Sequence, residues 1–214
     1  MILSLRIVDA NRKMLEIILD LYYSFYVELR SKQGLNPGSK KEYRSDVEEM
    51  FSRGDKIFIA FINDQPVGFV RISEREGAYW IEEIFVLPNY RGHGIGRALL
   101  EKAEEFISKR DIAAYVMVLP QDKDAINFWL KMGCRVLNTI ELVKEFVSTD
   151  RSKKVWLFEI FGYPVLLPRW EKEKLSDIER EYLIILEKFL SKFSREDYLR
   201  IITEALKEVL SKES

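Results

Sequence analysis

IFVLPNYRGHGIGRALL, residues 84–100, is the stretch that decides the fold. A short apolar run ends at a proline, three glycines follow within five residues, and an amphipathic helix then begins. A helix that starts after a glycine-rich turn presents free backbone N–H groups and the positive end of its dipole. Glycine also lets a ligand approach the backbone closely. The stretch therefore predicts an anion site. Its expected residues are Arg91, Gly92, His93, Gly94, Ile95, Gly96 and Arg97.

Two common phosphate-binding motifs do not fit this turn. A Walker loop needs Lys-Ser/Thr after its last glycine, and here Arg97-Ala98 follows. The dinucleotide fingerprint needs a different glycine spacing. The turn does resemble the Arg/Gln-x-x-Gly-x-Gly/Ala signature of the Gcn5-related N-acetyltransferases, as residues 91–96. This resemblance implies that the anion is the pyrophosphate of acetyl-coenzyme A. The alternative is a tight strand-to-helix turn that holds no ligand.

Composition narrows the class of protein. The 214 residues are 47% hydrophobic, and charged side chains nearly cancel to a net charge of −1, which argues against nucleic-acid or anionic-membrane partners. No apolar run reaches the ~18 residues of a membrane span. The single cysteine, Cys134, allows no internal disulfide, so we expect a cytoplasmic protein. The single histidine, His93, cannot share a metal with another, and we expect no metal cofactor. The Lys-, Glu- and Ile-rich composition is also thermophile-like.

The hydrophobic pattern predicts alternating strands and helices in the order β-α-α-β-β-β-α-β-α-β-β. The expected strands are 3–7, 56–62, 67–73, 78–87, 113–119, 134–143 and 154–160, and the expected helices are 15–29, 39–54, 95–110 and 122–133. This order resembles the acetyltransferase fold. The fold class is therefore expected to be α/β, with a mixed, mostly antiparallel central sheet flanked by helices, over residues 1–162.

Residues 163–214 form the second predicted part. Residues 163–170 are interpreted as a connector because prolines punctuate them, and two amphipathic helices are expected to follow as a hairpin. A helical hairpin cannot bury both of its faces alone. It is therefore expected to pack on the main domain or on a second copy, as a homodimer.

The resemblance also assigns roles to the strand before the turn. Free backbone groups of Phe85, Val86 and Leu87 are expected to pair with the cofactor's amide-rich arm, with the thioester beside Phe85 and Val86. The base that deprotonates the acceptor amine is expected to be Glu83, with Glu82 second, one on each face of the sheet. The alternative is that both carboxylates are ion-pair partners of neighbouring lysines or arginines. Tyr79 shares the parity of Glu83 and could line the same cleft.

A second stretch departs from the family pattern. Residues 122–134 match it at Ala125, Phe128 and Gly133, but Trp129 stands where the family usually has the tyrosine that protonates the leaving thiolate. An indole N–H is not a practical acid. Water, Tyr115 or Tyr79 would then supply the proton, and Trp129 would pack over the pantetheine arm. Asp122 replaces an asparagine that usually contacts the cofactor.

The acceptor is not identified by any motif. The loop at 31–39 is the candidate lid. It is flanked by the aromatic residues Tyr22, Tyr23, Phe25, Tyr26 and Tyr43, which core packing also explains. We expect an enzyme that moves an acetyl group from acetyl-coenzyme A to a primary amine of a small molecule or protein. The alternative is an acyl-coenzyme A binding sensor or assembly module with little catalysis.

Overall fold

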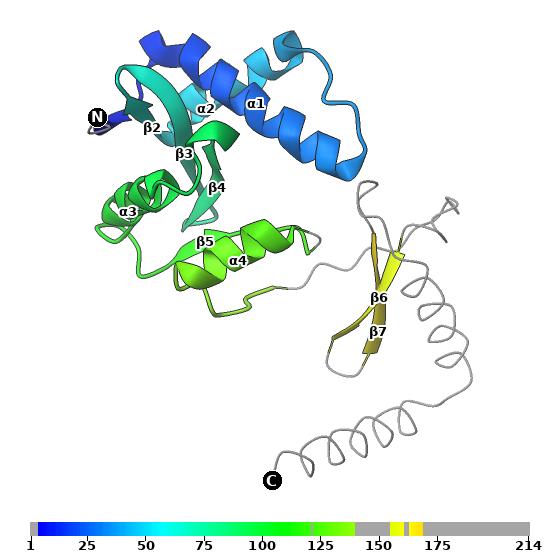
Figure 1. The fold of residues 1–214 in the computed structure, drawn as a ribbon. Helices are drawn as coiled ribbons and strands as arrows, with labels where there is room; N and C mark the ends of the chain where they lie inside the picture. The colour runs from blue at the N-terminus through cyan, green and yellow to red at the C-terminus, as the bar shows by residue number, and fades with distance from the viewer. Residues whose placement is uncertain (1–3, 121, 140–154, 161–162, 169–214) are drawn as a thin grey trace. The chain divides into compact units, whose positions relative to one another are not determined.

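The computed structural model describes residues 4–120, 122–139, 155–160 and 163–168 (Figure 1). The chain divides into two compact units, Met1–Arg135 and Val136–Ser214. The first unit holds a five-stranded sheet with helices on both faces. The predicted helical hairpin begins beyond residue 170 and lies outside the described residues.

The sheet of the first unit has the strand order β1-β2-β3-β4-β5. Neighbouring strands are antiparallel except β4 and β5, which are parallel, so the predicted mixed, mostly antiparallel sheet is confirmed. Residues Asn63 and Asp64 close the β2–β3 hairpin with positive φ angles of 48° and 64°. The strands are β1 (Leu5–Asp9), β2 (Lys56–Ile62), β3 (Gln65–Arg75), β4 (Ala78–Val86) and β5 (Ala114–Val116).

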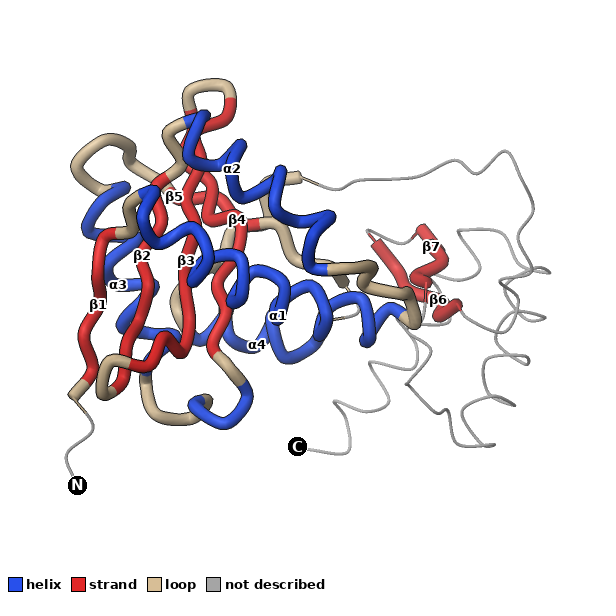
Figure 2. Tube along the Cα trace, turned by 90° about the horizontal axis from the view of Figure 1, so that it is seen from above, coloured by secondary structure: helices blue, strands red, loops and turns tan. Residues whose placement is uncertain are grey.

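Helices cover both faces of this sheet (Figures 1 and 2). One face carries α1 (Leu15–Gln33) and α2 (Arg44–Arg53), and the other carries α3 (Ile95–Ile107) and α4 (Lys123–Lys131). Short 3-10 turns precede three of the helices: η1 (Arg12–Met14), η2 (Lys40–Tyr43) and η3 (Pro88–Tyr90).

The helix boundaries follow the predicted signals with one exception. Asn11 accepts the Lys13 N–H at 3.0 Å before η1, and Gly34 and Gly54 end α1 and α2 in the left-handed conformation. The capping box expected at Ser39 does not form, because the Ser39 hydroxyl donates to the Glu42 carboxylate at 2.8 Å. The chain then continues as η2 before α2 begins.

The sheet separates two hydrophobic cores because side chains alternate along each strand. In β2, Ile57 and Ile59 face α1 and α2, whereas Phe58 and Ala60 face α3 and α4. This alternation explains why β2 is apolar throughout: it is covered on both sides.

Two strand predictions at the end of the fold were wrong. The segment expected as a buried strand at 113–119 is a strand over Ala114–Val116 alone, and these residues are exposed or half-buried. Of the strand expected at 134–143, residues 134–139 are not a strand, and residues 140–143 lie outside the described residues. In the second unit, β6 (Val155–Ile160) pairs instead with β7 (Tyr163–Pro168), in the segment expected to be a connector. Pro164 and Pro168 have the same parity, so the positions of their missing N–H groups fall on the same side of β7.

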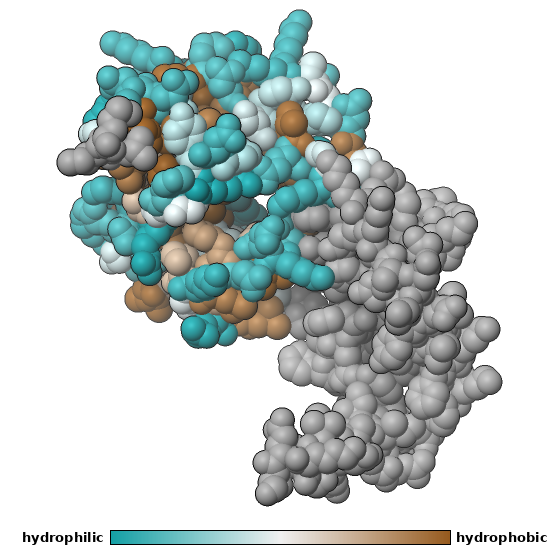
Figure 3. Space-filling view, in the orientation of Figure 1, coloured by the Kyte–Doolittle hydropathy of each residue, from teal (hydrophilic) through white to brown (hydrophobic). Residues whose placement is uncertain are grey.

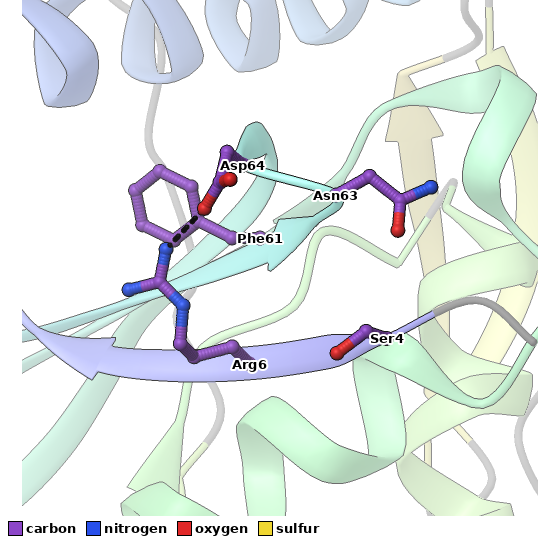
Figure 4. A pocket seen from close by; sticks show the side chains of 5 residues that line it. All are labelled: Ser4, Arg6, Phe61, Asn63 and Asp64. Carbon is purple, nitrogen blue, oxygen red and sulfur yellow. Dashed lines mark hydrogen bonds and ion pairs between the residues drawn. The ribbon is translucent and has the colours of Figure 1, made fainter.

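The surface adds little to the search for a site. A shallow pocket lies between Arg6 of β1 and the Asn63–Asp64 turn, at the edge of the sheet farthest from β5 in strand order (Figure 4). Exposed apolar side chains gather around β5 and α4 (Figure 3). Within the described residues, no helix is long and apolar enough to cross a membrane, and no three potential metal ligands come together.

Candidate active site

The glycine turn has the geometry of an anion site. Gly92 and Gly94 adopt φ angles of 78° and 79°, which glycine reaches without strain, and Gly94 is the residue before α3. The Ala98 N–H donates to the Gly94 carbonyl at 3.0 Å as the first bond of the helix. Earlier amides of the turn therefore have no helical acceptor. A side chain at Gly92 or Gly94 would meet no atom within 4 Å, so the space beside the turn is open.

The residues of this turn divide into exposed and buried sets. Ile95 is buried in the core and anchors the start of α3, while Gly96 is half-buried against Phe128 of α4. The exposed set comprises Arg91, Gly92, His93, Gly94 and Arg97.

Arg91 fixes the turn to the rest of the domain. Its Nε donates to the Val86 carbonyl at 2.8 Å, and its two terminal nitrogens contact the Glu28 carboxylate of α1 at 3.1 and 2.6 Å. Lys32, one helical turn further along α1, lies 3.2 Å from the Asp122 carboxylate. Asp122 also accepts the Ala125 N–H at 3.1 Å and caps α4. The ion pairs thus connect the glycine turn and the start of α4 to the same end of α1.

The strand that leads into the turn separates from its parallel neighbour. β4 pairs with β5 only at Tyr79, Trp80 and Ile81, and β5 ends at Val116. Beyond Ile81, β4 is held by β3 on the other side, where the Leu87 N–H donates to the Val67 carbonyl. Phe85 and Val86 are themselves buried. The two strands therefore separate beyond Ile81, but the Val86 carbonyl accepts a hydrogen bond from Arg91 and the Leu87 N–H donates to Val67, so these two backbone groups are not free as expected.

A β-bulge changes which side chains share a face of β4. Arg71 pairs with Glu83 and Ile72 pairs with Ile81, so Glu82 is an extra residue opposite no partner. Tyr79 therefore packs with the α3 core, and Glu83 lies on the opposite face. The prediction that Tyr79 shares the face of Glu83 was wrong, because strict alternation is interrupted at Glu82.

The same bulge brings the two candidate carboxylates together. Glu82 contacts Ser73 and Arg75, which have the parity of Arg71 and lie on the α1–α2 face, where Glu83 also lies. The expectation that Glu82 and Glu83 occupy opposite faces was therefore wrong. Burial is the main cause that raises the pKa of Glu83, and the nearby charge of Glu82 adds to it.

Glu83 is part of a buried charge cluster. Arg71 Nε and Nη2 donate to the two Glu83 oxygens at 2.6 and 2.8 Å, and Arg71 Nη1 donates to Asp55 at 2.6 Å. The three side chains are 8%, 5% and 3% exposed, respectively. Burial raises the pKa of Glu83, and the two bonds from Arg71 counter part of that rise.

Glu82 is bound by groups that are nearer to solvent. Ser73 and Arg75 both donate to it, with Arg75 Nε 2.5 Å from Oε1. Burial opposes its ionisation, but these hydrogen bonds outweigh burial, and the pKa of Glu82 lies below its ordinary value. The Arg75 side chain is 46% exposed, in contrast to the buried Arg71. Both carboxylates thus have the arginine partners named in the alternative interpretation.

Trp129 lies in the core between the sheet and α4. It is 8% exposed, and its ring packs edge-on against Phe128 at 5.1 Å. The other proton donors suggested by the sequence lie on different faces. Tyr79 packs against Phe106 of α3, while the Tyr115 ring lies 5.2 Å from Trp80.

The aromatic residues around the loop 31–39 are mainly structural. Tyr22 is buried, and its ring contacts those of Tyr26 and Tyr43 at 4.8 and 6.0 Å. Tyr23 and Tyr43 donate to the carbonyls of Gly38 and Pro37 and so hold the loop in place. Phe25 packs on Phe85 at 5.9 Å. Core packing therefore accounts for this cluster.

Four residues near the carboxylates were missed by the sequence reasoning: Asp55, Arg71, Arg75 and Trp80. Arg71 alone carried a signal, because an arginine interrupts the apolar run of β3. The others owe their place to the β3–β4 register and to the bulge.

A mixed sheet that opens between β4 and β5 next to a glycine-rich helix start defines the acyl-CoA N-acyltransferase fold. Solved structures agree. An aminoglycoside N-acetyltransferase in complex with CoA aligns with a TM-score of 0.55 at 18% identity, over 68% of this chain and 97% of that one. A probable acetyltransferase aligns with a TM-score of 0.54 at 18% identity, over 67% and 99%.

The model of the acetyltransferase (GNAT) family matches residues 15–134, and the chain belongs to this family. It is 34% identical over 137 residues to an uncharacterized N-acetyltransferase of Methanocaldococcus jannaschii, a match that spans 58% of each chain. It is 36% identical to an uncharacterized N-acetyltransferase of Archaeoglobus fulgidus, over 44% of this chain and 69% of that one. It is 30% identical to the Escherichia coli peptidyl-lysine N-acetyltransferase YjaB, over 47% and 66%.

Proposed function

We propose that this protein transfers the acetyl group of acetyl-CoA to a primary amine. The observation that carries the proposal is the row of unpaired amides from Gly92 to Arg97 at the start of α3, directly after the separated part of β4. These amides and the helix dipole would bind the pyrophosphate. The relatives that match the family include a peptidyl-lysine acetyltransferase, so a lysine-type acceptor is consistent with this role.

The length of β4 supports a defined position for the donor. Leu87 follows Glu82 by five positions, which corresponds to about 17 Å of extended chain at ~3.3–3.4 Å per residue. An extended pantetheine arm with its pyrophosphate on the turn would run past Val86 and Phe85 and place the acyl end toward Glu82. The amine nitrogen would then attack the thioester carbonyl carbon, the C–S bond would break, and the thiolate would leave with a proton from solvent or from Tyr115.

The amine must lose a proton during this step, and we assign the base to Glu82 rather than Glu83. Glu83 accepts two hydrogen bonds from Arg71, a buried arginine that cannot move away without leaving an unpaired charge in the core. Glu82 is bound by Arg75, whose side chain is half exposed and can turn into water. Glu83 therefore has a structural role in β4, and Glu82 is the carboxylate that an acceptor can reach.

The second candidate function is an acyl-CoA binding module with little catalysis. Trp129 favours it, because the position that usually supplies the acid holds a buried indole. Both candidates require the same cofactor site and differ only in whether free CoA thiol accumulates.

Calorimetry with acetyl-CoA tests the cofactor site. Gly94→Glu places a carboxylate at the turn and should abolish binding. Gly77→Glu is the matched control, because Gly77 has nearly the same φ angle of 80° and open space around it, but lies in the β3–β4 hairpin. The proposal fails if the protein does not bind acetyl-CoA, or if both variants bind equally. Release of free thiol with a panel of amines then separates the enzyme from the binding module.

We also propose, from the sequence, a cytoplasmic protein whose residues 171–214 make a homodimer. The amphipathic spacing of Ile178, Tyr182 and Ile185 supports this interface. Deleting 171–214 should reduce the mass measured by light scattering from dimer to monomer. A wild-type monomer would contradict it.

A further inference from the structure

The guanidinium group of Arg75 lies on the α1–α2 face of the sheet, between an aromatic ring and a carboxylate. The Arg75 guanidinium carbon is 4.9 Å from the centre of the Trp80 ring, and the same group pairs with Glu82. Trp80 in turn packs on Tyr115 of β5, with ring centres 5.2 Å apart and the planes inclined by 30°. Aromatic faces and a carboxylate are the groups that recognise an alkylammonium or guanidinium ion.

These residues lie where the acceptor would arrive. Trp80 and Tyr115 are paired in register one step before β4 and β5 separate, and Glu82 is the first residue after the last pair. They face the α1–α2 side, whereas Tyr79 and Val116 on the neighbouring rungs face the α3 core. The group thus stands at the end of the opening that is farthest along β4 from the glycine turn.

We propose that Trp80 and Tyr115 form a cation shelf beside the base Glu82, that this shelf binds a second positively charged group of the acceptor while Glu82 receives the reacting amine, and that Arg75 occupies both places until the acceptor displaces it. The inference rests on the proposed acetyl transfer and adds a substrate class: amines that carry a second positive charge. Arg75 is the specificity-determining residue, because every such acceptor must compete with it.

Displacing Arg75 requires little free energy. Its side chain is 46% exposed, so water replaces the contacts it leaves. Glu82 is only 12% exposed and would lose its charge partner, which an incoming ammonium group restores. Arg71 cannot play the same part, since it is buried between Glu83 and Asp55. The exchange therefore swaps one cation for another at a fixed carboxylate.

A pair of acceptors with the same five-carbon chain tests the shelf. Both 1,5-diaminopentane and pentylamine offer one primary amine to the thioester, but only the diamine has a second charge. We expect wild-type protein to acetylate the diamine with the higher kcat/KM. Arg75→Gln should raise that preference about three- to tenfold, the range expected for losing an exposed ion pair and a cation–π contact as competitors. Arg44→Gln is the matched control. Arg44 of α2 is 43% exposed, similar to Arg75, but it pairs with Glu16 of α1 and not with a residue of β4.

A titration without turnover keeps the proposal independent of catalysis. Calorimetry of 1,5-diaminopentane into CoA-saturated protein should show tighter binding for Arg75→Gln than for wild type, and none for Glu82→Gln. Equal diamine binding in wild type, Arg75→Gln and Glu82→Gln overturns the shelf while the cofactor site stands. Failure of CoA itself to bind overturns the proposed function instead. Trp80→Leu should weaken diamine binding without affecting CoA binding.

Discussion

Replacing Arg71 by methionine would show how much the buried charge cluster contributes to stability. Methionine has a similar length but no charge, so Glu83 and Asp55 would be left as carboxylates that are 5% and 3% exposed. Breaking a buried pair by removing one partner costs about 3–5 kcal/mol. Since domains of this kind are stable by about 5–15 kcal/mol, the variant should keep its fold but lose a large part of its unfolding free energy.

Two further variants separate the pair from the general effect of substitution. Arg71→Met combined with Glu83→Met removes both charges, and Asp55 retains Arg53 at 3.2 Å. We expect the double variant to be more stable than Arg71→Met alone, because an apolar pair fills the space without a stranded charge. Arg44→Met removes an exposed arginine and should cost only about 0–1 kcal/mol.

Urea unfolding followed by tryptophan fluorescence measures these differences, and its pH dependence gives a second check. Without Arg71, the bonds that counter burial are lost, so the pKa of Glu83 rises further. A carboxyl whose pKa is raised in the folded state stabilises at low pH and loses that contribution as the pH rises through its folded pKa. The deficit of Arg71→Met should therefore shrink in acid. A deficit below about 1 kcal/mol, or one that does not change with pH, would refute the reasoning.

Three other outcomes concern the proposed chemistry. Glu82→Gln should lower kcat for acetyl transfer by about 10²-fold or more at unchanged acetyl-CoA affinity, as expected for a lost base. Glu83→Gln should affect the unfolding free energy more than kcat. A larger loss of kcat in Glu83→Gln than in Glu82→Gln would assign the base to Glu83. Arg75→Gln removes hydrogen bonds that lower the pKa of Glu82, so the acidic limb of the kcat/KM profile should move to higher pH, and an unmoved limb would contradict the assignment. Trp129→Phe removes only the indole N–H and should leave kcat within about twofold, since indole is not an acid; a larger fall in thiol release would show that this group contributes.

The strongest sequence patterns were sufficient to predict the architecture of the sheet and its flanking helices. β2 has the predicted bounds, because an apolar run between a glycine stop and an Asn-Asp turn leaves little freedom. The turn before α3 was equally clear from its glycines, because Gly92 and Gly94 have positive φ angles that favour glycine. The β6–β7 pairing was not foreseen, because prolines were weighed as breaks and a two-stranded sheet has edges that tolerate them.

The arrangement of the catalytic candidates needed the structure. Strict alternation places Glu82 and Glu83 on opposite faces, and a single extra residue reverses that conclusion. A bulge leaves no mark in hydrophobicity, since Ile81 and Ile84 read as core residues in either case. The partners of Glu82 are likewise set by the β3–β4 register and the bulge, which bring the Arg75 side chain within hydrogen-bond distance of Glu82, seven positions further along the chain.

The bulge has a consequence for insertions and deletions. Removing Glu82 from the chain would return β4 to unbroken alternation, with Tyr79, Ile81, Ile84 and Val86 still on the face they now occupy. Core packing therefore does not require a residue at this position, and a chain one residue shorter could fill both cores with the same side chains. Glu82 can then be read as an inserted residue that the scaffold tolerates, held by hydrogen bonds from Ser73 and Arg75 and not by core packing.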